Sequence, residues 1–185
     1  LDNIKKYFDM DKTIEDDEDI FAMIDTAKQE GRIDVINSIK KNLIRRGNYE
    51  SVKLLIKDCF ASNDDYVQAE INYIESSSYD INEEKIYEIE QDITKSNNPV
   101  FIKKFNDTIH NILLKPDFSR MGTWNYLNMV DKYFNQGLLS NQEYYDINEN
   151  YYQKADEWPR QGYINFLLKE KEHLPIVRKY LSKII

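Results

Sequence analysis

The chain has 185 residues, of which 41% are hydrophobic, and this is enough for one sizeable domain or for a row of small repeated units. Its 25 basic and 33 acidic residues give a net charge of −8, so most of its surface would repel a phosphate backbone, which excludes a typical nucleic-acid-binding domain. Five glycines and four prolines are too few for the tight turns of an all-β sandwich, so helix is the expected structure.

The sequence carries no signal for a membrane or for an oxidising compartment. It contains no run of about 18 apolar residues, and its first residues do not resemble a signal peptide. Cys59 is alone and is expected within an apolar helical stripe, so it cannot form an internal disulfide or a multi-thiolate metal site. We expect a cytoplasmic protein without a cofactor, and a chain that begins at Leu1 suggests a missing upstream domain.

Three helices are predicted in the first third of the chain. Acidic residues and the terminal Gly31 bound a helix over 17–30. A second helix ends near Gly47 and carries Ile36, Ile39 and Leu43. The third has the most regular apolar spacing of the sequence, at Val52, Leu55, Ile56, Cys59 and Phe60. The second and third helices therefore predict a helical hairpin over 32–61.

Similar pairs follow along the chain. Helices are expected over 64–77 and 82–95, then over a long segment after residue 98 and over one that ends at Gly137. Ser140 is a candidate N-cap for a further helix, and apolar helices are expected beyond Pro159. The hairpins begin near residues 32, 64 and 98, so the starts are about 32 and 34 residues apart, close to the tetratricopeptide period.

The predicted fold is a single all-α domain over residues 1–185, built as a tetratricopeptide-like solenoid of helical hairpins. A hairpin that cannot bury both of its faces alone can stack the exposed face on its neighbour. The alternative is an irregular helical bundle, because helices of ordinary length produce a similar period without stacking.

Two segments carry a family resemblance. "RGNYESVKLLIKDC" looks like the turn and second helix of a tetratricopeptide repeat, with Val52 in place of the usual small residue and without the Trp-Leu-Gly-Tyr signature of the first helix. "DDYVQAEINYIESSSYDI" resembles the repeat region of the peptide-pheromone regulators of Gram-positive bacteria, their phages and plasmids (the Rgg, PrgX, PlcR, NprR, Rap and arbitrium-receptor type). The resemblance covers about residues 30–155. It implies a domain that dimerises and binds a short peptide on a concave surface, behind an N-terminal DNA-binding domain.

The candidate binding residues come from aligning the hairpins on their starts. Asn72, Asn106 and Asn148 then occupy equivalent positions, and an amide that both donates and accepts could hold the backbone of an extended peptide. Neighbouring residues could line the same groove: Tyr73, Asn111, Tyr126 and Asn128. The alternative is ordinary packing or helix surface. The tyrosines at 144, 145, 151 and 152 are likewise expected to form either a core or a partner interface.

No catalytic motif occurs. The histidines, His110 and His173, stand outside any HExxH pattern, and no phosphate-binding loop or GxSxG elbow is present. We therefore expect a non-enzymatic, dimeric sensor domain of a transcriptional regulator that binds a short peptide or a partner protein. It would reach nucleic acid only through a missing upstream domain. The alternatives are a phage or mobile-element interaction module, which would inhibit another protein or act as a repressor's effector domain, and a helical enzyme or toxin with scattered carboxylates.

Overall fold

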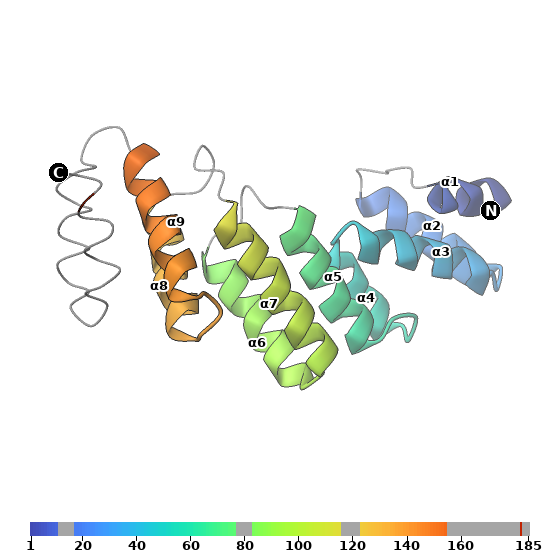
Figure 1. Cartoon of the computed structure of the whole chain (residues 1–185). Helices are drawn as coiled ribbons and strands as arrows, with labels where there is room; N and C mark the ends of the chain where they lie inside the picture. Colours follow the sequence, from blue (N-terminus) through green and yellow to red (C-terminus); the bar gives the residue numbers. More distant parts are fainter. Residues whose placement is uncertain (11–16, 77–82, 116–122, 155–181, 183–185) are drawn as a thin grey trace. The chain divides into compact units, whose positions relative to one another are not determined.

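The computed structural model of the chain describes residues 1–10, 17–76, 83–115, 123–154 and 182 (Figure 1). These residues form helices and connecting turns, with no strand among them. The prediction of an all-α protein is confirmed for this part of the chain. The helices are α1 (Asp2–Asp9), α2 (Asp17–Gln29), α3 (Ile33–Arg45), α4 (Tyr49–Lys57), α5 (Asn63–Ser76), α6 (Glu83–Ser96), α7 (Pro99–Leu114), α8 (Thr123–Asn135) and α9 (Asn141–Lys154).

The contacts define two compact units, Leu1–Thr108 and Ile109–Ile185. The single repeat domain over residues 1–185 stays a prediction. In the first unit α3 contacts α1, α2, α4 and α5, and α5 also contacts α6 (Figure 1). In the second unit α8 packs against α9. The helix pairs α3–α4 and α5–α6 correspond to the first two predicted hairpins. None of the described helices is long and apolar enough to cross a membrane.

Glycines end three of the helices, as the sequence predicts. Gly31, Gly47 and Gly137 have φ angles of 66°, 72° and 78°, in the left-handed region that favours glycine. After α3, the N–H of Gly47 bonds the carbonyl of Ile44 at 3.0 Å, and the N–H of Asn48 bonds that of Leu43 at 3.0 Å. This pair of bonds is a Schellman motif, which satisfies carbonyls that the helix end leaves unpaired.

Capping boxes begin α5 and α9. The Ser140 hydroxyl accepts the N–H of Glu143 at 3.3 Å, while the Glu143 carboxylate accepts the N–H of Ser140 at 2.8 Å. Ser62 and Asp65 form the same reciprocal pair before α5, at 3.1 Å and 2.9 Å. The prediction that Ser140 is an N-cap is therefore confirmed.

Two local predictions differ from the structure. The apolar stripe predicted through Cys59 stops early, because α4 ends at Lys57 and Cys59 is exposed with a φ of 61°. The N–H groups of Cys59 and Phe60 close a Schellman motif on α4 without a glycine. Helix α1 lies in a segment that the sequence left unassigned, and the apolar segments predicted beyond Pro159 lie outside the described residues.

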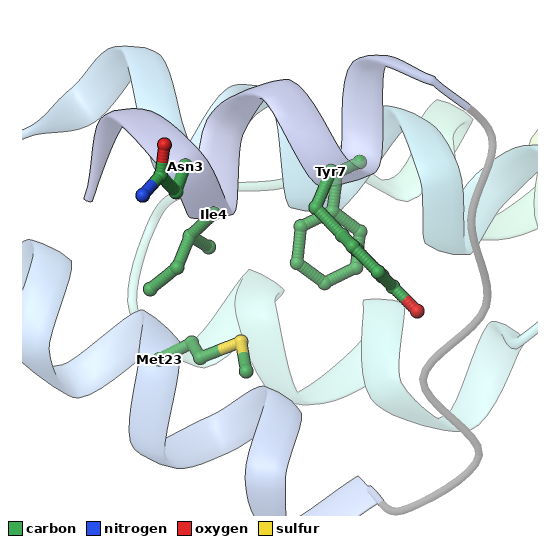
Figure 2. A pocket seen from close by; sticks show the side chains of 5 residues that line it. Asn3, Ile4, Tyr7 and Met23 are labelled. Atoms are coloured by element: carbon green, nitrogen blue, oxygen red, sulfur yellow. The ribbon is translucent and has the colours of Figure 1, made fainter.

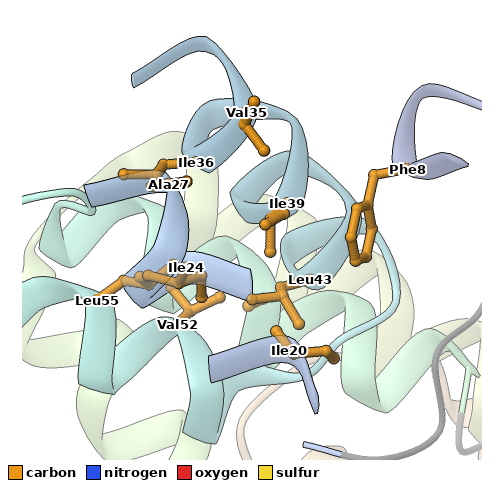
Figure 3. Close-up of a cluster of buried hydrophobic side chains, with 11 residues drawn as sticks. Phe8, Ile20, Ile24, Ala27, Val35, Ile36, Ile39, Leu43, Val52 and Leu55 are labelled. Atoms are coloured by element: carbon orange, nitrogen blue, oxygen red, sulfur yellow. The ribbon is translucent and has the colours of Figure 1, made fainter. Parts of the chain in front are cut away.

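The core of the first unit is a cluster of apolar side chains, mostly aliphatic, between α1, α2, α3 and α4 (Figure 3). Burying one such side chain contributes about 1.5–3 kcal/mol, which holds short helices that would be marginal alone. Large, fully buried members of this cluster come from positions at helical spacing, among them Ile20, Ile24, Ile36, Ile39, Leu43, Val52 and Leu55.

Tyrosines contribute strongly to the core of the second unit. Tyr144 and Tyr145 are 4% and 0% exposed, so the core interpretation is confirmed for these two residues. The Tyr144 ring stacks on Phe134 with ring centres 4.0 Å apart, and its hydroxyl donates to Asp131 at 2.7 Å. A hydroxyl that reaches a carboxylate lets a large ring pack inside without losing its hydrogen bond. Tyr151 is partly exposed, and the side chain of Tyr152 lies outside the described set.

Candidate functional site

Asn72 connects three consecutive odd-numbered helices in the first unit. Its amide nitrogen donates to the carbonyl oxygen of Ile44 on α3 at 2.8 Å. Its amide oxygen accepts hydrogen bonds from Gln68 on α5 at 2.7 Å and from Lys104 on α7 at 3.2 Å. Asn72 therefore uses both halves of its amide to hold α3, α5 and α7 side by side.

Further polar contacts join α5 to α3 and α7 on either side of Asn72. Lys40 of α3 pairs with Asp65 of α5 at 3.4 Å, and Thr108 of α7 donates to Glu75 of α5 at 3.1 Å. Lys104 also lies 4.0 Å from Glu75. The charged side chains in these contacts are 20% to 46% exposed, so they remain accessible to solvent. We call the whole set the polar seam: Lys40, Asp65, Gln68, Asn72, Glu75, Lys104 and Thr108.

The register between α5 and α7 differs from the one that places Asn106 beside Asn72. The residue that contacts Asn72 is Lys104, and Asn106 follows two residues later, roughly 200° further around the helix. Asn106 is half-buried, and its side chain makes no hydrogen bond with another described residue. The structure therefore gives Asn72 and Asn106 different surroundings, although both belong to the first unit.

Tyr73, the residue after Asn72, belongs to a group of tyrosines between α4 and α5. The ring of Tyr49 meets Tyr73 edge-on with centres 5.1 Å apart, and it meets Tyr66 edge-on at 6.2 Å. All three rings are partly exposed. Lys85 of α6 places its ammonium 4.5 Å from the centre of the Tyr49 ring, within the range of a cation–π contact.

A buried carboxylate lies in the same region. Glu70 of α5 is only 1% exposed, and Tyr66, one turn earlier on the same helix, lies beside it. Burial raises the pKa of Glu70 to about 7, mainly because the charged form loses its hydration. The sequence offered a signal for this residue, since Glu70 falls on the apolar face of α5 with Val67 and Ile74.

The remaining predicted binding residues belong to the second unit, where they divide into buried and exposed pairs. Tyr126 is 0% exposed and donates to the carbonyl of Leu113 at 2.8 Å. Asn148 is 2% exposed and its amide donates to the carbonyl of Tyr144 one turn earlier at 2.8 Å. Asn111 and Asn128 are exposed. Tyr126 and Asn148 are therefore used in packing, while the two exposed asparagines remain accessible.

The only close group of serine, carboxylate and histidine described in the structure has the wrong connectivity for nucleophilic catalysis. Glu143 accepts from the Ser140 hydroxyl at 2.7 Å and lies 3.0 Å from His110 Nε2. In a catalytic triad the histidine contacts the serine, because it must take the serine's proton. Here the carboxylate lies between them, so the group works as a helix cap.

No metal centre is found among the described residues. No group of three or more His, Cys, Asp or Glu side chains converges there in a way that could hold an ion. The acidic pairs that have helical spacing on α6, such as Glu88 with Asp92, fit a solvated helix face, since Glu88 and Asp92 pair with the nearby Lys85 and Lys95. The acidic run at 15–19 lies partly outside the described residues.

An apolar recess opens between α1 and α2 (Figure 2). Its volume is about 350 Å³, and its walls are Asn3, Ile4, Tyr7 and Phe8 from α1 and Met23 from α2. Tyr7 and Phe8 meet edge-on with ring centres 5.7 Å apart. Such a recess suits an apolar side chain, because its lining offers few polar groups for orienting a charged ligand.

No protein-family model matches the chain, and neither a curated protein nor a solved structure shows significant similarity to it. The fold and the polar seam are therefore the basis for any functional inference.

Proposed function

We propose that the chain is a tetratricopeptide-like repeat domain that binds a short peptide or a segment of a partner protein along the polar seam. The observation that carries this proposal is the continuous set of contacts through Asn72, which joins α3 to α5 and α5 to α7. First helices that contact each other in series are what stacked helical hairpins require. The irregular bundle remains the alternative architecture.

The seam has the chemistry that an extended peptide needs. A peptide strand carries unpaired N–H and C=O groups, and the seam offers carboxamides, ammonium groups and carboxylates that are partly exposed. Asn72 already uses its oxygen and one N–H within the protein, so it can give a ligand only its second N–H unless the present contacts open. Gln68 and Lys104 are therefore the residues that we expect to contact a ligand first.

In a regulator, ligand binding would change the arrangement of the helix pairs. A peptide that contacts α3, α5 and α7 together stabilises the arrangement in which these contacts are simultaneously possible. We propose that this change passes to a dimer partner and to a separate DNA-binding domain of a longer cytoplasmic protein. Light scattering on the purified chain tests the dimer, whose mass would be twice 22.2 kDa.

The peptide proposal is tested by selecting short linear peptides from a displayed library on the purified chain and measuring their affinity by calorimetry. Gln68→Ala and Lys104→Ala should each weaken the affinity for the selected peptide several-fold, because each removes a polar group of the seam. Asn63→Ala is the matched control, since Asn63 is an exposed asparagine at the beginning of α5. Unchanged affinity in both variants would remove the seam as the binding site.

The recess between α1 and α2 supports a second candidate function, an interaction module that docks on an apolar side chain of another protein. This module would need no peptide recognition along the seam. Met23→Glu places a charge in the wall of the recess and should abolish such an interaction. A partner whose binding is lost with Met23→Glu but retained with Gln68→Ala would favour the module over the peptide receptor.

A further inference from the structure

Glu70 is an acidic residue whose side chain is almost completely shielded from solvent. Its side chain is 1% exposed, and its Oε2 atom makes no hydrogen bond with any residue that the structure describes. Tyr66, one turn earlier on α5, lies beside the carboxylate and favours its ionised form. Ionising a buried carboxylate costs free energy when one of its oxygens accepts no hydrogen bond, because the lost hydration is only partly replaced.

The charges around Glu70 come from both neighbouring helices. Lys53 of α4 lies over the Tyr66 ring at 5.6 Å, and Lys85 of α6 lies over the Tyr49 ring at 4.5 Å and pairs with Glu88 at 3.0 Å. Both lysines favour the ionised form of Glu70, while Asp92 of α6 opposes it. The charged side chains of α3 and α7 contact other residues of α5. Lys40 of α3 pairs with Asp65, and Lys104 of α7 contacts Asn72 and Glu75.

We propose that the ionisation of Glu70 controls how tightly α6 packs on α5. In the neutral form the carboxyl group stays buried beside Tyr66, and Lys85 stays over Tyr49. In the ionised form the carboxylate attracts Lys85 away from Tyr49 and Glu88 and repels Asp92, so the contacts between α5 and the first turns of α6 rearrange. This inference does not depend on the proposed peptide ligand.

The direction of the pH effect follows from linkage. The pKa of Glu70 is raised from an ordinary value of 4.5 to about 7, so between these two values the folded state holds a proton that the unfolded state has released. The stability contributed by the neutral form is fully present below about 4.5, falls as pH rises toward 7, and is lost above it. Near neutral pH, small changes in pH therefore alter the fraction of molecules in which Glu70 is protonated.

The first experiment compares the unfolding of the whole chain in urea from about pH 5 to about pH 8, for wild type and two variants. Glu70→Gln keeps the shape but cannot ionise, so over this range wild type should lose roughly 100-fold in its folding equilibrium constant relative to this variant. Glu75→Gln is the control on the same helix, because its carboxylate is 46% exposed, and it should follow wild type. Parallel pH curves for wild type and Glu70→Gln would overturn the proposal.

The second experiment uses only the wild-type chain, so its outcome does not depend on whether a variant folds. An NMR titration of the Glu70 carboxyl carbon in the wild-type chain should have its midpoint near 7, and a midpoint near the ordinary value of 4.5 would overturn the proposal. Hydrogen exchange of the α6 amides, corrected for the intrinsic pH dependence, should become roughly ten-fold or more faster across the same midpoint. If Glu70 titrates near 7 while α6 protection stays constant, the proposed control of helix packing is wrong.

Discussion

Gly47 lies directly against the backbone of Tyr73. A Cβ atom at position 47 would stand closer to both the Cα and the N of Tyr73 than non-bonded atoms can approach. The turn between α3 and α4 therefore rests on the backbone of α5, next to the hydrogen bond from Asn72 to Ile44. A side chain at this turn would force α5 away from α3.

This contact predicts that Gly47→Ala is far more damaging than a chemically identical change at Gly31. Both glycines have a left-handed φ, which costs a non-glycine residue about 1–2 kcal/mol. Only Gly47 adds a backbone clash, whereas a Cβ at Gly31 would meet nothing within 4 Å. We expect Gly47→Ala to destabilise the first unit by about 3 kcal/mol or more in urea unfolding. Equal losses in the two variants would show that the approach to Tyr73 is not tight.

Cys59 predicts a stabilising substitution. It occupies the left-handed position at the end of α4 with a φ of 61°, where glycine is favoured. Cys59→Gly should raise the free energy of unfolding by about 1 kcal/mol, because it relieves the steric cost of this conformation. Cys59→Ala removes the same thiol and keeps the Cβ, so it should give no gain. Comparing the two by urea denaturation separates backbone relief from the loss of the thiol.

Asn72→Ala should lower stability as well as any ligand affinity. The substitution removes the hydrogen bond to Ile44 and the acceptor for Lys104, which we expect to cost about 1–2 kcal/mol. Asn63→Ala changes an exposed asparagine of the same helix and should stay within about 0.5 kcal/mol of wild type. Thermal unfolding of the two variants checks whether Asn72 joins the helices or merely lies between them.

Ser140→Ala should weaken the beginning of α9. It removes the hydroxyl that accepts the N–H of Glu143, and the loss of such a cap costs about 1 kcal/mol. Asn141→Ala, which changes an exposed residue in the first turn of the same helix, should have little effect. Circular dichroism during thermal unfolding would reveal the difference, and equal melting temperatures would argue against the cap.

Glu143 predicts a loss of stability in acid. Hydrogen bonds from Ser140 lower the pKa of Glu143, and the nearby His110 acts in the same direction. Because the folded pKa is depressed, this stability is present above the ordinary value of 4.5 and is lost as pH falls through the folded value. Glu143→Gln should flatten the acid side of the stability curve. A variant that loses stability in acid as steeply as wild type would contradict this assignment.

Helix positions were largely predictable because their signals are local. Apolar spacing and terminal glycines placed α2 to within a residue or two, and Ser140 marked the beginning of α9. The end of α4 was missed because a cysteine occupies a conformation for which glycine is the usual signal. Helix α1 was not predicted, since it is short and has no side-chain cap, and packing on α3 holds it.

The candidate site depended on contacts that sequence spacing cannot specify. Aligning the hairpins on their starts paired Asn72 with Asn106, but a shift of two residues moves a side chain to another part of the helix surface, and Lys104 takes that place. On α8, Tyr126 is buried, whereas Asn128, two residues later, is exposed. This difference depends on which face of α8 packs against the rest of the unit.

The amino-acid sequence by itself determined that the described chain is helical and where most of its helices begin and end, because caps, glycines and apolar periodicity act within a few residues of one another. The tertiary structure decided which side chains meet across helices: Asn72 with Lys104, Gly47 with Tyr73, and the burial of Glu70 beside Tyr66. These pairings depend on the docking angle and register of whole helices, which many distributed contacts set together.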